Sequence, residues 1–227
     1  MIRRIGLVSA AGAALFLGAT ASASAGTLDQ QQTSSNTNAG IFATVSGAQT
    51  FTAGKTGGLD QADLLLSKLA TIPEPLTVEI RNATAGGPGT SVLASGSIPN
   101  SAIGPNPPAF VSVTFATPAA VTAGTQYTLV AYTTHVLNDS LGWYYQSDTD
   151  PYSGGALFTG GGPVPPLGPW NDQGGDDDFA FKTYVTPPPS TPSTPPTTKH
   201  KKKCKKHKKH RSAESAKKKK CKKKKHG

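Results

Sequence analysis

Apolar and polar residues alternate along much of the middle of the chain, with the period of two at which β-strand side chains share one face. In residues 76–81, for example, Leu76, Val78 and Ile80 fall on one face and polar residues lie between them. Similar segments are rich in the β-branched and aromatic residues that are typical of strands. The pattern predicts strands at residues 76–81, 111–115, 127–132 and 179–184, with weaker candidates at residues 49–53, 91–98 and 141–146.

Turn-forming residues separate these segments. Glycine and proline, which favour the backbone angles of tight turns, cluster at residues 57–58, 86–89, 105–108, 123–124 and 154–155. Short strands that alternate with such turns are typical of an antiparallel β-sandwich or barrel. We therefore predict an all-β fold.

Residues 59–69 fit either a helix or a strand. Their Leu, Ala, Gln and Lys residues favour a helix by intrinsic propensity. As a strand, the segment places Leu64 and Leu66 on one face. Leu65 and Leu69 fall on the other face. Because the neighbouring strands need a partner and no other long helix is predicted, we favour the strand.

The first 25 residues have the three parts of a secretory signal peptide. Arg3 and Arg4 form a positive start, residues 5–19 are mainly apolar, and Ala23-Ser24-Ala25 matches a cleavage site. We predict removal of residues 1–25 on export, in preference to a membrane anchor or a buried helix. The mature protein would then be secreted and extracellular, or associated with the cell surface, without a transmembrane segment.

Composition and charge divide the rest of the chain. Glycine and proline, at 25 and 19 of 227 residues, exclude a helical bundle, while 36% hydrophobic residues exclude disorder throughout. Residues 26–185 contain 4 basic and 12 acidic side chains and no cysteine, whereas residues 199–227 contain 17 basic side chains and one acidic. An acidic β-domain is thus joined to a polycationic tail.

Residues 186–198 form the predicted linker between these two regions. They contain six prolines among serines and threonines, a composition that favours extended polyproline II and reaches about 40 Å. The tail at residues 199–227 has almost no apolar side chains, so it has no surface to bury and we predict that it is disordered.

The tail predicts binding to polyanions. Each lysine that pairs with an anionic group releases a counterion, so affinity is high at low salt and falls as salt rises. Suitable partners are anionic extracellular polymers: wall polyphosphates, lipopolysaccharide, acidic glycans, anionic lipid surfaces and, non-specifically, nucleic acid. The alternative is a tail that only aids solubility. The lysines concerned are Lys201, Lys202, Lys203, Lys217, Lys218, Lys219, Lys220, Lys222, Lys223, Lys224 and Lys225.

Cys204 and Cys221 lie among these lysines. Positive neighbours lower the pKa of a thiol, so both cysteines should be reactive. A disulfide between them or a crosslink between chains is the favoured interpretation, and free thiols are the alternative. A zinc site with nearby histidines is disfavoured, since the spacing matches no standard zinc motif.

Six aspartates in the last third of the body are candidate calcium ligands. Carboxylates that converge from two loops supply the oxygen ligands that calcium requires, although no EF-hand spacing is present. We favour the simpler interpretation that these side chains cap turns and keep the body soluble. No other cofactor is predicted. The candidates are Asp148, Asp150, Asp172, Asp176, Asp177 and Asp178.

Aromatic residues of the same region are candidate glycan contacts. An exposed ring stacks on the apolar face of a sugar, while nearby polar groups bind its hydroxyls. In a strand at residues 141–146, however, Trp143 and Tyr145 face one way and Tyr144 the other, so one face belongs to the core. The glycan candidates are Trp143, Tyr145, Tyr152 and Trp170.

Nothing in the sequence predicts catalysis. The body contains a single histidine, His135, and no nucleophile elbow, HExxH motif or phosphate-binding glycine loop. We therefore predict no catalytic residues and no enzymatic activity.

Four segments resemble one known type of domain. Together they are similar to the secreted bacterial domains described as choice-of-anchor domains, over roughly residues 40–185. The resemblance implies a jelly-roll-like β-sandwich, secretion and a variable C-terminal attachment device, and it implies no activity. This chain departs from the family at its C-terminus, which has neither a sorting motif nor a hydrophobic tail. The segments are Gln49–Gly54, Val78–Asn82 with residues 87–90 and 93–94, Val121–Val130, and Asp178–Val185.

These observations predict a secreted, non-catalytic binding protein whose tail tethers a β-sandwich electrostatically to anionic extracellular polymers. A carbohydrate-binding module is the alternative function. An extracellular hydrolase is a third, less favoured one.

Overall fold

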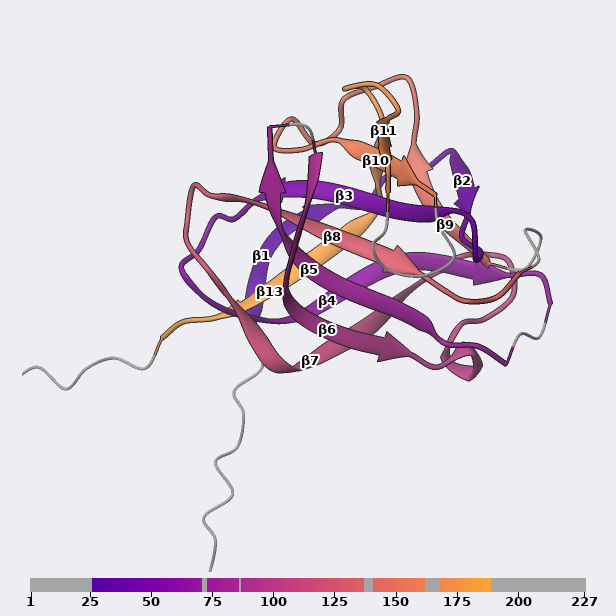
Figure 1. Cartoon of the computed structure of the whole chain (residues 1–227), viewed down its shortest axis with the longest axis horizontal. Helices are drawn as coiled ribbons and strands as arrows, with labels where there is room; N and C mark the ends of the chain where they lie inside the picture. The colour runs from indigo at the N-terminus through magenta and orange to yellow at the C-terminus, as the bar shows by residue number, and fades with distance from the viewer. Residues whose placement is uncertain (1–25, 71–72, 86, 137–140, 162–167, 189–227) are drawn as a thin grey trace, which may run out of the picture. The chain divides into compact units, whose positions relative to one another are not determined.

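The computed structural model describes residues 26–70, 73–85, 87–136, 141–161 and 168–188 (Figure 1). The predicted signal peptide at residues 1–25, most of the linker and the whole polycationic tail lie outside these residues. The described strands begin at Thr27 and end at Thr186, close to the predicted limits of the β-domain. No helix among the described residues is long and apolar enough to cross a membrane.

The described residues form an all-β fold, as the alternating pattern predicted. Thirteen strands and one short 3₁₀ helix, Asn100–Ala102, are found within them. The strands are β1 (Thr27–Gln32), β2 (Thr37–Gly40), β3 (Ser46–Thr52), β4 (Gly57–Lys68), β5 (Leu76–Thr84), β6 (Gly87–Ile98), β7 (Ala109–Val121), β8 (Gln126–Tyr132), β9 (Leu141–Gln146), β10 (Leu157–Gly160), β11 (Trp170–Asp172), β12 (Asp178–Phe179) and β13 (Phe181–Thr186).

Two antiparallel sheets contain these strands. One has seven strands in the order β1-β13-β4-β9-β12, with β7 paired to β4 and β2 paired to β9. The other has six strands in the order β11-β10-β3-β8-β5-β6. In Figure 1, β3, β8, β5 and β6 of the six-stranded sheet lie in front of β1, β13, β4 and β7. The jelly-roll connectivity stays a prediction.

Residues 59–69, which fitted a helix or a strand, belong almost entirely to strand β4. This strand is central, since it pairs with β13, β7 and β9. Its inward residues Ala62, Leu64 and Leu66 are at most 1% exposed. Burial of these side chains against the opposite sheet outweighs the helix propensity of the segment, because propensity differences are below about 1 kcal/mol per residue.

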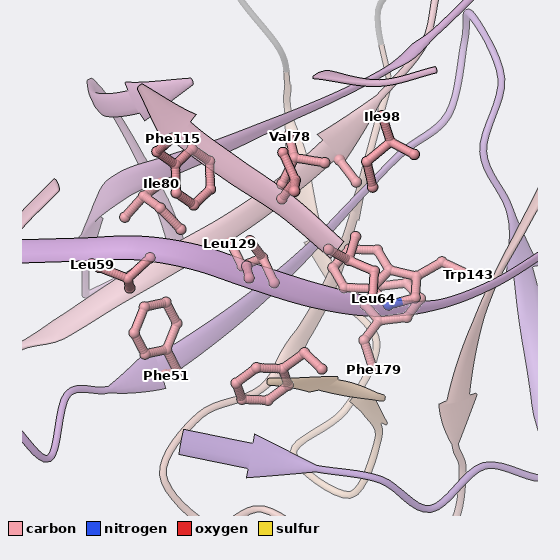
Figure 2. Packing of buried hydrophobic residues seen from close by; sticks show 14 of the residues in the cluster. Phe51, Leu59, Leu64, Val78, Ile80, Ile98, Phe115, Leu129, Trp143 and Phe179 are labelled. Atoms are coloured by element: carbon pink, nitrogen blue, oxygen red, sulfur yellow. The ribbon is translucent and has the colours of Figure 1, made fainter. Parts of the chain in front are cut away.

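One hydrophobic core fills the space between the two sheets (Figure 2). Both sheets contribute to it: Leu64 and Phe179 come from the seven-stranded sheet, and Phe51 and Val78 come from the six-stranded sheet. A smaller cluster of Ala48, Val130 and Phe158, with Trp170 packed against it, is separate from the main core. Burying the main core supplies the driving force for stacking the sheets.

Candidate functional site

A buried carboxylate joins the two sheets at one end of the core. Asp178 begins β12, and its Oδ1 accepts a hydrogen bond of 2.7 Å from Nε2 of Gln49 on β3. Its Oδ2 accepts a second bond, of 3.1 Å, from the backbone N–H of Tyr152. The amide oxygen of Gln49 accepts a bond of 2.7 Å from the backbone N–H of Phe179. Asp178 and Gln49 are both 0% exposed.

Burial raises the pKa of Asp178 to about 7, because the charged carboxylate loses its hydration. The hydrogen bonds from Gln49 and Tyr152 act in the opposite direction, and the nearby charges of Asp150 and Asp177 raise the pKa further. The group therefore exchanges its proton near neutral pH. Its role in the fold is to connect β12 to β3.

The six candidate calcium ligands do not come together as one metal-binding group within the described residues. No group of three or more Asp, Glu, His or Cys side chains there is placed to hold a metal ion. Asp172 accepts the backbone N–H of Gly174 within its own turn, whereas Asp177 accepts the backbone N–H of Asp148 from another loop. Asp148, Asp150, Asp172 and Asp176 are exposed, whereas Asp178 points inward to Gln49.

The prediction that Trp143 contacts a glycan is wrong. Its side chain is 0% exposed and its ring stacks on Phe179, with the ring centroids 3.9 Å apart. Its indole N–H donates to the backbone oxygen of Ala180. Figure 2 shows Trp143 and Phe179 together within the core. No sugar reaches a ring in this position.

The other three predicted glycan contacts are half-buried and far from forming one platform. Tyr145 packs edge-on against Phe179. The hydroxyl of Tyr152 donates to the Gln30 side chain and accepts the backbone N–H of Thr52, so this residue fastens a loop. Trp170 packs against the small cluster beside the six-stranded sheet. Tyr145 and Tyr152 therefore pack against the main core, whereas Trp170 packs against the small cluster.

The ring that the sequence candidates omitted is Tyr144. Alternation along β9 turns it away from the core, as the pattern of residues 141–146 indicated. Tyr144 lines a hollow of about 300 Å³ on the seven-stranded sheet, which we call the Tyr144 hollow. The residues that line it are Asn38, Gly40, Ser67, Leu69, Asn106, Leu141, Gly142 and Tyr144.

All four lysine and arginine side chains of the body are engaged within the fold. Lys55 donates to the backbone oxygen of Leu28, and Lys68 donates to the backbone and side-chain oxygens of Asn100. The ammonium group of Lys182 lies 4.2 Å from the centroid of the Phe110 ring, a cation–π contact.

Arg81 is the fourth of these side chains, and it is 4% exposed. Its guanidinium forms a buried ion pair of 2.6 Å with Glu79, and Tyr132 donates its hydroxyl to the same carboxylate. Tyr132 itself has its pKa raised to about 12, chiefly by burial and then by the hydrogen bond to Glu79. Arg81 and Glu79 therefore bind groups within the fold.

The single body histidine has no catalytic geometry among the described residues. Nδ1 of His135 lies 2.9 Å from the Glu74 carboxylate, while Nε2 is buried with no hydrogen-bond partner. In a Ser-His-acid triad, the second nitrogen accepts the proton of the nucleophilic hydroxyl. No hydroxyl of the described residues is bonded to Nε2 of His135.

The remaining predicted sites lie outside the described residues. They are the cysteines Cys204 and Cys221 and the polyanion-binding lysines of residues 201–225. Comparison with known proteins adds no assignment: no protein-family model and no curated protein matches the chain.

Proposed function

We propose that the chain is a secreted, non-catalytic binding protein, in which residues 199–227 tether the β-domain to anionic extracellular polymers. The observation that carries this proposal is the engagement of every basic side chain of the body. Lys55, Lys68, Arg81 and Lys182 are each bound within the fold. The body therefore has no free cationic patch for a polyanion.

The charge distribution along the sequence supports the same division of roles. Residues 26–185 have a net charge of −8, and residues 199–227 have a net charge of +16. A polyanion is repelled by the first region and attracted by the second. The proline-rich residues 186–198 connect these two regions in the sequence.

The choice of polymer follows from lysine chemistry. A lysine ammonium is a compact point charge without the planar fork that gives arginine bidentate selectivity. The tail would accordingly bind phosphate-rich, sulfate-rich and carboxylate-rich polymers, with an affinity that rises with their charge density.

Cys204 and Cys221 would add a crosslink between tails, or a loop within one tail, after export to an oxidising compartment.

Release by salt from the producing cells tests this proposal. We expect the cell-associated protein to elute at about 0.5 M salt, because screening and counterion uptake weaken each lysine contact. A chain in which Lys217–Lys220 and Lys222–Lys225 are changed to glutamine should appear mainly in the medium. Lys182→Gln is the control, and it should remain bound to the cells. Equal retention of the glutamine-substituted and natural chains would contradict the proposal.

A carbohydrate-binding module is the second candidate function, and one observation favours it. The Tyr144 hollow combines an aromatic ring with amide and hydroxyl side chains on an outer face of the body. This arrangement is independent of the tail.

A further inference from the structure

Strand pairing brings the polar side chains of the Tyr144 hollow together. In the seven-stranded sheet, β9 lies between β2 and β4, with Tyr144 opposite Asn38 and Gly142 opposite both Gly40 and Ser67. Residues directly opposite one another share a face of the sheet. Asn38, Tyr144 and Ser67 therefore share the outer face of the sheet, where Ser67 is only 4% exposed, and two glycines lie between them.

The two glycines leave the floor of the hollow without side chains. A Cβ atom on Gly142 would lie 2.8 Å from Oδ1 of Asn38, so the Asn38 side chain rests against the bare backbone there. The walls are formed by Tyr144 and Ser67 on the strands and by Asn106 in the segment between β6 and β7. Leu69, which is 78% exposed, adds an aliphatic edge.

Hydrogen bonds fix the Tyr144 ring. Its hydroxyl oxygen lies 3.2 Å from Oγ of Ser67, and the hydroxyl donates to Oδ1 of Asn106 over 3.4 Å. The amide of Asn38 has no hydrogen-bond partner among the described residues. The hollow therefore offers a held ring and an amide with free donors and acceptor.

None of the described residues that line the hollow carries a charge. Lys68, the nearest charge along β4, turns to Asn100 and binds its backbone and side-chain oxygens. Within the described part of the chain, the lining has no cation to attract an anion and no carboxylate to bind a metal ion. A ligand suited to this surface is uncharged, rich in hydroxyl groups and apolar on one face.

Sugars have this combination of properties. The C–H face of a pyranose packs on an aromatic ring, and its hydroxyls exchange hydrogen bonds with planar amide groups, which both donate and accept. A volume of about 300 Å³ is at the small end of ligand sites. We propose that the Tyr144 hollow binds one or two residues of an uncharged saccharide.

Another hollow of the body is less suited to a sugar. It has a volume of about 350 Å³ and lies against the six-stranded sheet. Thr50 is hydrogen-bonded to the backbone of Ala156, Thr52 donates to Gly154, and Thr84 donates to Gly87. These hydroxyls already have partners within the fold. Gln126, which is exposed at the same hollow, provides a matched control for Asn38.

The test uses the full mature chain, from residue 26 to 227, on an array of neutral and acidic oligosaccharides. Measurement in about 0.5 M salt suppresses binding through the lysines of the tail. Failure of sugar binding can therefore be distinguished from failure of the proposed tether. We expect binding to neutral oligosaccharides that persists at this salt concentration. No binding to any neutral oligosaccharide would overturn the proposal.

Variants test whether the sugar binds in the Tyr144 hollow. The neutral oligosaccharide that binds best on the array is titrated into each variant, and the affinities are compared. Tyr144→Ala and Asn38→Ala should each weaken binding at least tenfold, whereas Gln126→Ala should leave the affinity unchanged. Gly142→Ala removes no polar group but displaces the Asn38 side chain, so it should also weaken binding. Tyr144→Phe, which keeps the ring, should retain more affinity than Tyr144→Ala and guards against a folding defect. Unchanged affinity in Tyr144→Ala and Asn38→Ala would overturn the proposal.

Discussion

Strand β9 has two faces that use polar groups in opposite ways. On the inner face, Trp143 stacks on Phe179 and its N–H is bonded to a backbone oxygen, beside the paired side chains of Asp178 and Gln49. On the outer face, Tyr144 borders a hollow where the Asn38 amide has no partner among the described residues. Polar groups that are bonded within the fold stabilise it, and polar groups left free remain available for ligands.

Alanine substitutions of two adjacent residues sharpen this comparison most strongly. Trp143→Ala should lower the free energy of unfolding by about 3–5 kcal/mol, because it leaves a large cavity in the core. Tyr144→Ala should lower it by only about 1 kcal/mol, since the side chain lies outside the core and loses only its hydroxyl contacts with Ser67 and Asn106. Denaturant unfolding of both variants gives the two values. Equal losses of unfolding free energy in the two variants would contradict the distinction between a buried inner face and an exposed outer face of β9.

The next largest effect concerns the support of the buried carboxylate. Gln49→Ala removes the partner of Asp178 and should cost about 2–3 kcal/mol at pH 8, where Asp178 is ionised. The cost should be smaller at pH 5, because a protonated carboxyl tolerates the loss better. Thermal or denaturant unfolding at both pH values checks the prediction. If the loss of unfolding free energy in Gln49→Ala were the same at both pH values, Gln49 would not act by stabilising the charge on Asp178.

Stability should also depend on pH through Asp178 itself. Its pKa is raised to about 7 in the fold from a usual value of 3.8, so the folded protein holds a proton that the unfolded chain has lost. The stabilisation is complete below about pH 4 and is lost as pH rises through 7.

Between these limits the free energy of unfolding should fall by about 1.4 kcal/mol per pH unit relative to Asp178→Asn, which cannot ionise. Unfolding curves of the two proteins from pH 4 to pH 8 measure the difference. A difference that stays constant, or that rises with pH, would contradict the burial of this group as the cause.

The smallest expected effect is that of Lys182→Gln. The variant loses the contact with the Phe110 ring, which is worth about 0.5–1 kcal/mol at an exposed site. Its unfolding free energy should therefore fall by no more than that amount. Its affinity for polyanions should be unchanged, because the body is not the cationic part of the chain. A weaker affinity would show that the engaged lysines still contribute to binding.

Sequence patterns were sufficient for the strands that cross the core. The alternation at residues 76–81 and the β-branched and aromatic residues at 127–132 both fall in strands, β5 and β8. In β4, burial of the leucines of that strand outweighs its helix propensity. Strands such as β1, with the sequence TLDQQQ, carry no such pattern. β1 lies at the edge of its sheet and is held by backbone pairing with β13, which needs no apolar side chains.

The candidate sites were predictable only in part, because they depend on which loops and faces meet. Six aspartates near one another in sequence were candidate calcium ligands, yet Asp172 binds its own turn, Asp177 binds another loop, and Asp178 is hydrogen-bonded by Gln49 from a distant strand. Alternation alone was enough to place Tyr144 and Trp143 on opposite faces of the same strand. Its neighbours Asn38 and Asn106 come from other segments, so only the strand pairing reveals the hollow.

The most direct test of the proposed function is the salt dependence of binding to a DNA duplex, a polyanion of known charge density. For the natural mature chain, the logarithm of the binding constant should fall steeply with the logarithm of salt concentration, with a slope near −0.9 for each phosphate neutralised. Changing Lys217–Lys220 and Lys222–Lys225 to glutamine lowers the tail charge from +16 to +8, and the slope should fall by about half. An unchanged slope would contradict a tether made of these lysines.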